Sequence, residues 1–205
     1  MRSTPQCSQS ILTYILSAVF ILLICTTASA QNEKPSTPTP TPTPMPQNTP
    51  TPTTPPARPA DVGSIDSIIA AVYDVISGPA GQKRDWDRMR SLFVPGARLI
   101  PTGRGPTGEV GSRVRTVEEY IARSSPILEK DGFFEREIAR RTETFGNIAH
   151  AFSTYESRHK ADDPKAFQRG INSIQLMNDG KRWWIVTIFW QGEDEKNPLP
   201  EKYLR

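Results

Sequence analysis

The spacing of hydrophobic residues changes part-way along the chain, from a helical period to a strand period. Over residues 62–77 the apolar side chains recur every three or four positions, which predicts one buried face of an α-helix. Asp85 is a suitable N-cap for a second helix over residues 86–93. Thr116, followed by acidic residues, is typical of the start of a third helix that reaches about Lys130, with a kink at Pro126.

Strands are predicted mainly in the second half. A short strand over residues 97–100 precedes a Gly-rich polar loop that runs to Gly111. Four antiparallel strands are then expected, over residues 133–144, 147–159, 167–177 and 181–191. Helices followed by strands indicate an α+β fold in which the helices pack on one face of a curved, mostly antiparallel sheet.

The last strand, residues 182–190, is apolar on both faces, so both faces need a cover. Strict alternation gives two sets of side chains: Trp183, Ile185 and Phe189 on one face, and Trp184, Val186, Ile188 and Trp190 on the other. A two-residue turn at Asp179-Gly180 would pair Asn172 with Thr187. A three-residue turn would move the last strand to the opposite face.

The N-terminal residues 1–30 are predicted to be a signal peptide. An apolar run from Ile11 to Cys25 is followed by Ala28 and Ala30, an A-x-A pattern that makes Gln31 the mature N-terminus. An uncleaved membrane anchor and a lipidated Cys25 are the alternatives. In each case we expect an exported protein, periplasmic or secreted.

Three further segments follow from composition. Residues 31–61 hold over half of the 20 prolines and are predicted to be a disordered Thr/Pro-rich linker. Residues 62–193 form the domain, and residues 194–205 form a polar tail that packs through Leu199, Tyr203 and Leu204. Both cysteines fall within the signal segment, so no disulfide is expected in the mature protein.

Four sequence phrases, in this order, carry a resemblance to a known superfamily: AAVYDVIS, DWDRMRSLFVPGARLI, FGNIAHAFSTYESR and INSIQLMNDGKRWWIVTIFW. The region from Ile65 to Glu193 resembles the NTF2-like superfamily, which includes SnoaL-like polyketide cyclases, scytalone dehydratases and ketosteroid isomerases. It also resembles uncharacterised secreted bacterial members of this superfamily. The resemblance implies a cone with a ligand pocket between the helices and the sheet.

The resemblance also implies candidate residues for that pocket. Tyr73 lies where ketosteroid-isomerase-like proteins carry an oxyanion tyrosine, and Asn172 lies where they carry a second donor. Those enzymes place a carboxylate base where this chain has Ile100-Pro101, so isomerisation by that route is not expected. Thr187 opposite Asn172 would make these two residues a polar island among apolar neighbours.

His150 and Thr154 complete the pocket candidates, since they share one face of the strand after Gly146. His150 and Glu156 are about 20 Å apart along a strand, so an acid–base dyad of these two alone is excluded. Charged residues of this strand and its neighbour are expected to form a surface ladder that includes Glu135, Arg136, Arg140, Arg141, Glu156 and Arg158.

Other classes of function lack support. The net charge of +3 is spread along the chain without a basic stripe, so no nucleic-acid partner is expected. No metal site or cofactor is expected, because the two histidines have no metal-ligand spacing. Gly103–Gly108 lacks the Lys-Ser/Thr ending of a phosphate loop and is interpreted as a pocket rim.

Three functions stay open. The first is binding of a small apolar or amphipathic ligand in the cone. The second is a lyase or isomerase that uses Tyr73, Asn172 and His150. The third is an interaction module, with a homodimer formed through the sheet face that carries Trp184 and Trp190.

Overall fold

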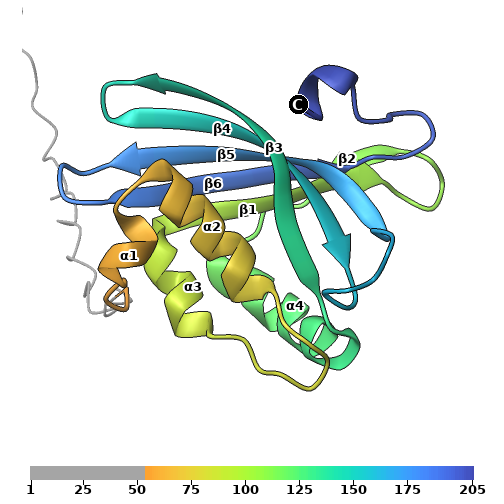
Figure 1. The fold of residues 1–205 in the computed structure, drawn as a ribbon, viewed down its shortest axis with the longest axis horizontal. Helices are drawn as coiled ribbons and strands as arrows, with labels where there is room; N and C mark the ends of the chain where they lie inside the picture. The colour runs from red at the N-terminus through yellow and green to blue at the C-terminus, as the bar shows by residue number, and fades with distance from the viewer. Residues whose placement is uncertain (1–53) are drawn as a thin grey trace, which may run out of the picture. The chain divides into compact units, whose positions relative to one another are not determined.

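The computed structural model describes residues 54–205, and the predictions for the signal peptide and most of the linker lie outside this range. Helices come first and strands dominate the second half, as Figure 1 shows. The elements are α1 (Pro59–Val62), α2 (Ile65–Ile76), α3 (Trp86–Leu92), β1 (Phe93–Arg104), β2 (Val110–Ser112), α4 (Val117–Asp131), β3 (Phe134–Phe145), β4 (Ile148–Arg158), β5 (Gln168–Asn178), β6 (Trp183–Gly192) and the 3₁₀ helix η1 (Glu201–Tyr203). The predicted α+β class is confirmed.

Side-chain caps fix the helix starts. Asp85 accepts a hydrogen bond from the backbone N–H of Arg88 at the start of α3. Thr116 and Glu119 form a reciprocal capping box at the start of α4, and Pro126 lies inside that helix. The sequence signals for these starts were local, which is why the predicted boundaries agree with the structure.

The strands form one six-stranded sheet in the order β2-β1-β6-β5-β4-β3. The pairing of β1 with β6 is parallel, and the other pairings are antiparallel. The strand β1 is much longer than the predicted residues 97–100, and β2 lies within the predicted Gly-rich loop. The length of β1 comes from pairing with the distant β6, which a local pattern does not reveal, whereas β2 pairs with the end of β1 across a short loop.

The predicted register of the β5–β6 hairpin is wrong. Residues 179–182 form the connection, so Asn178 pairs with Trp183, and Asn172 pairs with Trp190 instead of Thr187. Asp179 stabilises this longer turn by accepting hydrogen bonds from the backbone N–H groups of Lys181 and Arg182.

A β-bulge then changes the facing of β6. Gln175 pairs with Thr187 while Leu176 pairs with Ile185, so Val186 is the extra residue. Ile185 and Ile188 are therefore both buried in the core. The bulge explains part of the apolar pattern of β6. Strict alternation assigns Ile185 and Ile188 to opposite faces, but they lie on either side of the bulge and so reach the same face.

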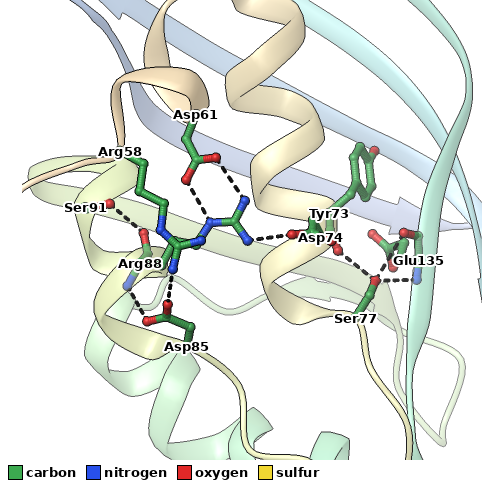
Figure 2. A network of polar contacts seen from close by, with 9 residues as sticks. All are labelled: Arg58, Asp61, Tyr73, Asp74, Ser77, Asp85, Arg88, Ser91 and Glu135. Atoms are coloured by element: carbon green, nitrogen blue, oxygen red, sulfur yellow. Dashed lines mark hydrogen bonds and ion pairs between the residues drawn. The ribbon is translucent and has the colours of Figure 1, made fainter.

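The helices cover one face of the sheet, which we call the inner face (Figure 1). Charged contacts tie the helices together at their exposed side. The guanidinium of Arg88 donates to the Asp61 carboxylate in α1 and to Asp74 in α2, as Figure 2 shows. Arg84 is buried and donates to backbone carbonyl oxygens of Ile76 and Leu128, at 2.9 and 3.1 Å. None of the helices within residues 54–205 is long and apolar enough to cross a membrane.

Candidate functional site

Polar side chains meet on the inner face, beside the middle of α2. Tyr73 of α2, Ser153 of β4 and Asn172 of β5 are all buried. The Tyr73 hydroxyl lies 2.7 Å from Oγ of Ser153, and Nδ2 of Asn172 donates to the Tyr73 hydroxyl at 3.0 Å. Ser153 donates in turn to Oε1 of Glu137 at 2.5 Å. The structure thus brings the candidates Tyr73 and Asn172 into direct contact.

The direction of the hydrogen bonds among Asn172, Tyr73, Ser153 and Glu137 follows from the Glu137 carboxylate. An ionised carboxylate only accepts hydrogen bonds, so the hydroxyl hydrogen of Ser153 is used on Glu137. The Tyr73 hydroxyl must then donate to Ser153 while it accepts from Asn172. Its single hydrogen is committed within the protein. The oxyanion role that the resemblance implies for Tyr73 would require this chain of hydrogen bonds to break.

Glu135, at the start of β3, is the titratable group of this site. Its carboxylate accepts from Oγ of Ser157 at 2.8 Å and from Nδ2 of Asn172 at 3.3 Å. Burial raises the pKa of Glu135 to about 7, and these two hydrogen bonds only partly oppose the rise. A carboxyl group of this kind is present in both ionisation states near neutral pH.

The predicted surface ladder is wrong about Glu135. Arg136 and Arg158 do pair with Glu156, each at 2.5 Å, on the face of the sheet away from the helices. Glu135 pairs across the strands with Ser157, whose side chain is buried on the inner face. Neighbouring residues of a strand point to opposite faces, so Glu135 and Arg136 cannot belong to one ladder.

Ser77 fixes the position of Glu135 relative to α2. Its hydroxyl donates to the carbonyl oxygen of Tyr73 at 2.7 Å and accepts from the backbone N–H of Glu135 at 3.0 Å, as Figure 2 shows. The end of α2 is thereby joined to the start of β3. This contact holds Tyr73 and Glu135 on adjacent elements of the same wall.

The polar wall borders a cavity of about 130 Å³ between the helices and the inner face, which we call the inner cavity. Tyr73, Glu135, Tyr155 and Asn172 supply polar groups to its lining. Most of the remaining lining is apolar and includes Val72, Met89, Leu99, Ile174, Ile188 and Trp190. A small space of this kind suits a molecule with one apolar body and few polar atoms.

A larger groove of about 680 Å³ lies between α2 and β3. Tyr73 and Glu135 line this groove as well as the inner cavity, so they form part of the wall between the two spaces. Arg140 in the groove already has partners, since it pairs with Asp66 and Glu137. The groove is therefore a polar approach to the wall that Tyr73 and Glu135 form.

The candidates His150 and Thr154 lie on the opposite face of the sheet, which we call the outer face. His150 Nε2 is 2.8 Å from Oγ of Ser173, and the Thr154 hydroxyl donates to the carbonyl oxygen of Tyr203 at 2.6 Å. Alternation grouped these residues correctly on one face, but it did not say which face the helices cover.

Thr187 also lies on the outer face, because the bulge at Val186 reverses the facing of the residues around it. It pairs with Arg98 of β1 and Gln175 of β5, and not with Asn172. Of the five pocket candidates, only Tyr73 and Asn172 line the inner cavity.

The C-terminal segment crosses part of the outer face, and we call residues 194–205 the strap. The ring of Tyr203 packs against Phe152, with centroids 5.0 Å apart, and Arg141 donates to the carbonyl oxygen of Lys202 at 2.8 Å. A space of about 290 Å³ remains between the strap and the residues Phe152, Ile171 and Phe189. The strap therefore covers part of the apolar surface that the sequence predicted on this face.

Among residues 54–205, no group of three or more His, Cys, Asp or Glu side chains is arranged to hold a metal ion.

No protein-family model and no curated protein matches this chain. Its structural neighbours are NTF2-like and ketosteroid isomerase-like proteins. A protein of unknown function with a cystatin-like fold from Nostoc punctiforme is 12% identical, with a TM-score of 0.48 over 64% of this chain and 90% of that one. An NTF2-like protein of unknown function from Silicibacter pomeroyi is 14% identical, with a TM-score of 0.43 over 64% of this chain and 94% of that one. A ketosteroid isomerase-like protein from Parabacteroides distasonis is 15% identical, with a TM-score of 0.43 over 65% and 91%. These similarities concern the fold and say nothing about a ligand or an activity.

Sequence reasoning missed two residues of the site, Glu135 and Tyr155. The signal for Tyr155 was present, since it alternates with His150 and Thr154 and so belongs to the other face of β4. Glu135 gave a weaker signal, because it stands in a run of charged residues where a solvent-facing position is the usual interpretation.

Proposed function

We propose that this protein binds a small amphipathic molecule in the inner cavity. The observation that supports the proposal is a largely apolar space with hydrogen-bonding groups on one wall. Its volume of about 130 Å³ is below the roughly 300–1,000 Å³ of common ligand pockets. It is close to the roughly 150 Å³ of an engineered apolar cavity that accepts benzene. The expected ligand is therefore about the size of a single six-membered ring.

A thermal-shift screen of single-ring compounds tests this proposal. Val72→Phe fills the inner cavity and should abolish the stabilisation that a bound compound gives to the wild-type protein. Ile171→Phe, which adds the same ring under the strap, is the matched control and should leave the stabilisation unchanged. If Ile171→Phe alone abolished the stabilisation, the ligand would bind on the outer face, under the strap. No stabilisation by any compound would contradict the proposal.

Acid–base catalysis is a second candidate function, and Glu135 is the observation that favours it. Its raised pKa of about 7 suits a general base at neutral pH, and its carboxylate lines the inner cavity. The alternative lyase or isomerase would use Glu135, with Asn172 nearby, and would leave out His150, which lies on the outer face.

Deuterium exchange tests for such a base without a known substrate. Cyclohexanone deuterated at its α-carbons should lose deuterium to solvent faster with wild-type protein than in buffer, because the Glu135 carboxylate would take the deuteron and exchange it. Glu135→Gln should return the rate to that of buffer. Equal rates with the wild-type protein and the variant would contradict this second function.

We also propose that the domain is exported and held away from a surface by its Thr/Pro-rich segment. The support is the sequence of residues 1–61, most of which lies outside the described part of the chain. Mass spectrometry of the protein from the producing cell should give a mature N-terminus at Gln31. An intact Met1 in the membrane fraction would instead support the uncleaved anchor.

A further inference from the structure

Tyr155 presents a hydroxyl to the inner cavity for which residues 54–205 supply no partner. It lies on the inner face of β4, is only 2% exposed and lines the cavity. Within residues 54–205, no hydrogen bond to its hydroxyl is present, and burial together with the nearby Glu135 carboxylate raises the pKa of the phenol. The hydroxyl therefore stays protonated at neutral pH and can donate.

Tyr73, the other tyrosine discussed for this wall, differs in this respect. Its hydroxyl is saturated, since it accepts from Asn172 and is paired with Ser153. A ligand oxygen gains little from a donor that must first leave its protein partners. The Tyr155 hydroxyl, in contrast, has no protein partner within residues 54–205 to leave before it donates to a ligand oxygen.

The backbone opposite Tyr155 leaves room for this hydroxyl. Gly170 is its cross-strand partner, and a Cβ at that position would lie 2.6 Å from the Tyr155 hydroxyl. Any larger residue would push the phenol out of its present position. Glycine at residue 170 thus keeps the hydroxyl at the cavity wall.

We propose that Tyr155, and not Tyr73, donates the hydrogen bond that orients the ligand, and that the ligand is a small neutral ring carrying a carbonyl or similar acceptor oxygen. This inference rests on the proposed binding function. An anionic ligand is excluded because Glu135 lines the same cavity and its ionised form would repel a negative charge. An acceptor oxygen is required because the protonated Tyr155 hydroxyl offers a donor to the cavity.

Calorimetric titration with a matched pair of probes tests the inference. Cyclohexanone carries the acceptor oxygen, and methylenecyclohexane has the same shape without it. Tyr155→Phe should weaken cyclohexanone binding about tenfold, the effect of one lost hydrogen bond in a buried site. The same variant should leave methylenecyclohexane binding within about twofold of wild type. Tyr73→Phe is the comparison variant: because the Tyr73 hydroxyl is already paired with Ser153 and Asn172, its loss should weaken cyclohexanone binding less than the loss of the Tyr155 hydroxyl, by under about threefold.

The outcomes separate the two proposals. Binding of neither probe by the wild-type protein contradicts the proposed function, and this inference with it. Binding of both probes, with a loss in Tyr73→Phe equal to or larger than that in Tyr155→Phe, overturns the inference alone.

The ligand-free protein gives an independent readout. Tyr155→Phe removes a hydroxyl without partners and should leave the melting temperature unchanged or raised, whereas Tyr73→Phe strands Asn172 and Ser153 and should lower it. A clear fall in Tyr155→Phe would overturn the assignment of an unpartnered hydroxyl.

Discussion

At the scale of single residues, the inner wall is organised around Asn172. Its Nδ2 group reaches both the Tyr73 hydroxyl and the Glu135 carboxylate, so one amide links a chain of neutral hydroxyls to a titratable acid. An amide can donate both hydrogens at any pH, which a carboxyl group in its place could do only when protonated. The ionisation of Glu135 is therefore what changes with pH on this wall near neutrality.

Glu135 predicts a pH dependence of stability. Its pKa rises from an ordinary value of 4.5 to about 7 in the folded protein, so the folded state holds the proton more tightly than the unfolded chain. The stability that this proton contributes is fully present below about pH 4.5 and is lost as the pH rises through about 7. Tyr73, Tyr120, Tyr155 and Glu137 are the other titratable groups around this wall.

Glu135→Gln removes the titration and should be more stable than wild type by about 1–3 kcal/mol at roughly pH 8. Well below pH 4.5, where Glu135 is protonated in both the folded and the unfolded state, the variant and wild type should unfold at similar urea concentrations. If the difference in free energy of unfolding between variant and wild type did not change with pH, Glu135 would not be a buried acid in solution.

At the scale of elements, Arg84 joins the end of α2 to α4 through backbone carbonyl oxygens alone. Replacing it by Lys keeps the charge but loses the planar fork that reaches several carbonyls at once. We expect Arg84→Lys to lower the free energy of unfolding by about 3 kcal/mol, because buried acceptors are left without donors. Arg90→Lys, at a half-exposed ion pair with Glu118, should cost less than about 1 kcal/mol in the same urea titration. Equal effects would contradict a structural role for Arg84.

The strap gives a second prediction at this scale. Tyr203→Ala removes the ring that packs on Phe152 and should cost about 1–2 kcal/mol of stability. Tyr203→Phe should behave like wild type, because Thr154 donates to the backbone carbonyl and not to the phenol. Thermal unfolding of the two variants decides this, and equal melting temperatures for Ala and Phe would show that the strap does not pack in solution.

The elements also show where prediction from sequence succeeded and where it stopped. Helix starts at Asp85 and Thr116 carry their own capping residues, and the contact between Tyr73 and Asn172 joins two residues that the resemblance singled out. The facing of Thr187 depended on one extra residue at Val186, which no local pattern marks. The side on which His150 lies depended on where distant helices pack, so periodicity could group the residues of β4 but could not orient them.

At the scale of the whole molecule, the outer face keeps an apolar surface that the strap covers only in part. Phe189 is 44% exposed there, and Trp184 and Val186 are half-exposed, whereas Ile188 and Trp190 lie toward the inner face. A homodimer through the outer face remains our prediction, now with Phe189 near its centre in place of Ile188 and Trp190.

Light scattering at micromolar concentration should give the mass of a dimer for the wild-type protein. Phe189→Glu should shift it to a monomer, because a charge at a buried contact is unpaired. Ile127→Glu, at an exposed position of α4 away from this face, is the control and should remain dimeric. A monomeric wild type, or equal dissociation of both variants, would contradict the interface.

The central claim is that the inner cavity holds a small amphipathic molecule against its polar wall, and a crystal structure of the protein with cyclohexanone tests it most directly. We predict that the ring lies inside the cavity beside Ile174 and Trp190, with its oxygen about 3 Å from the Tyr155 hydroxyl. A cavity closed by its own side chains, or cyclohexanone bound only under the strap, would contradict it.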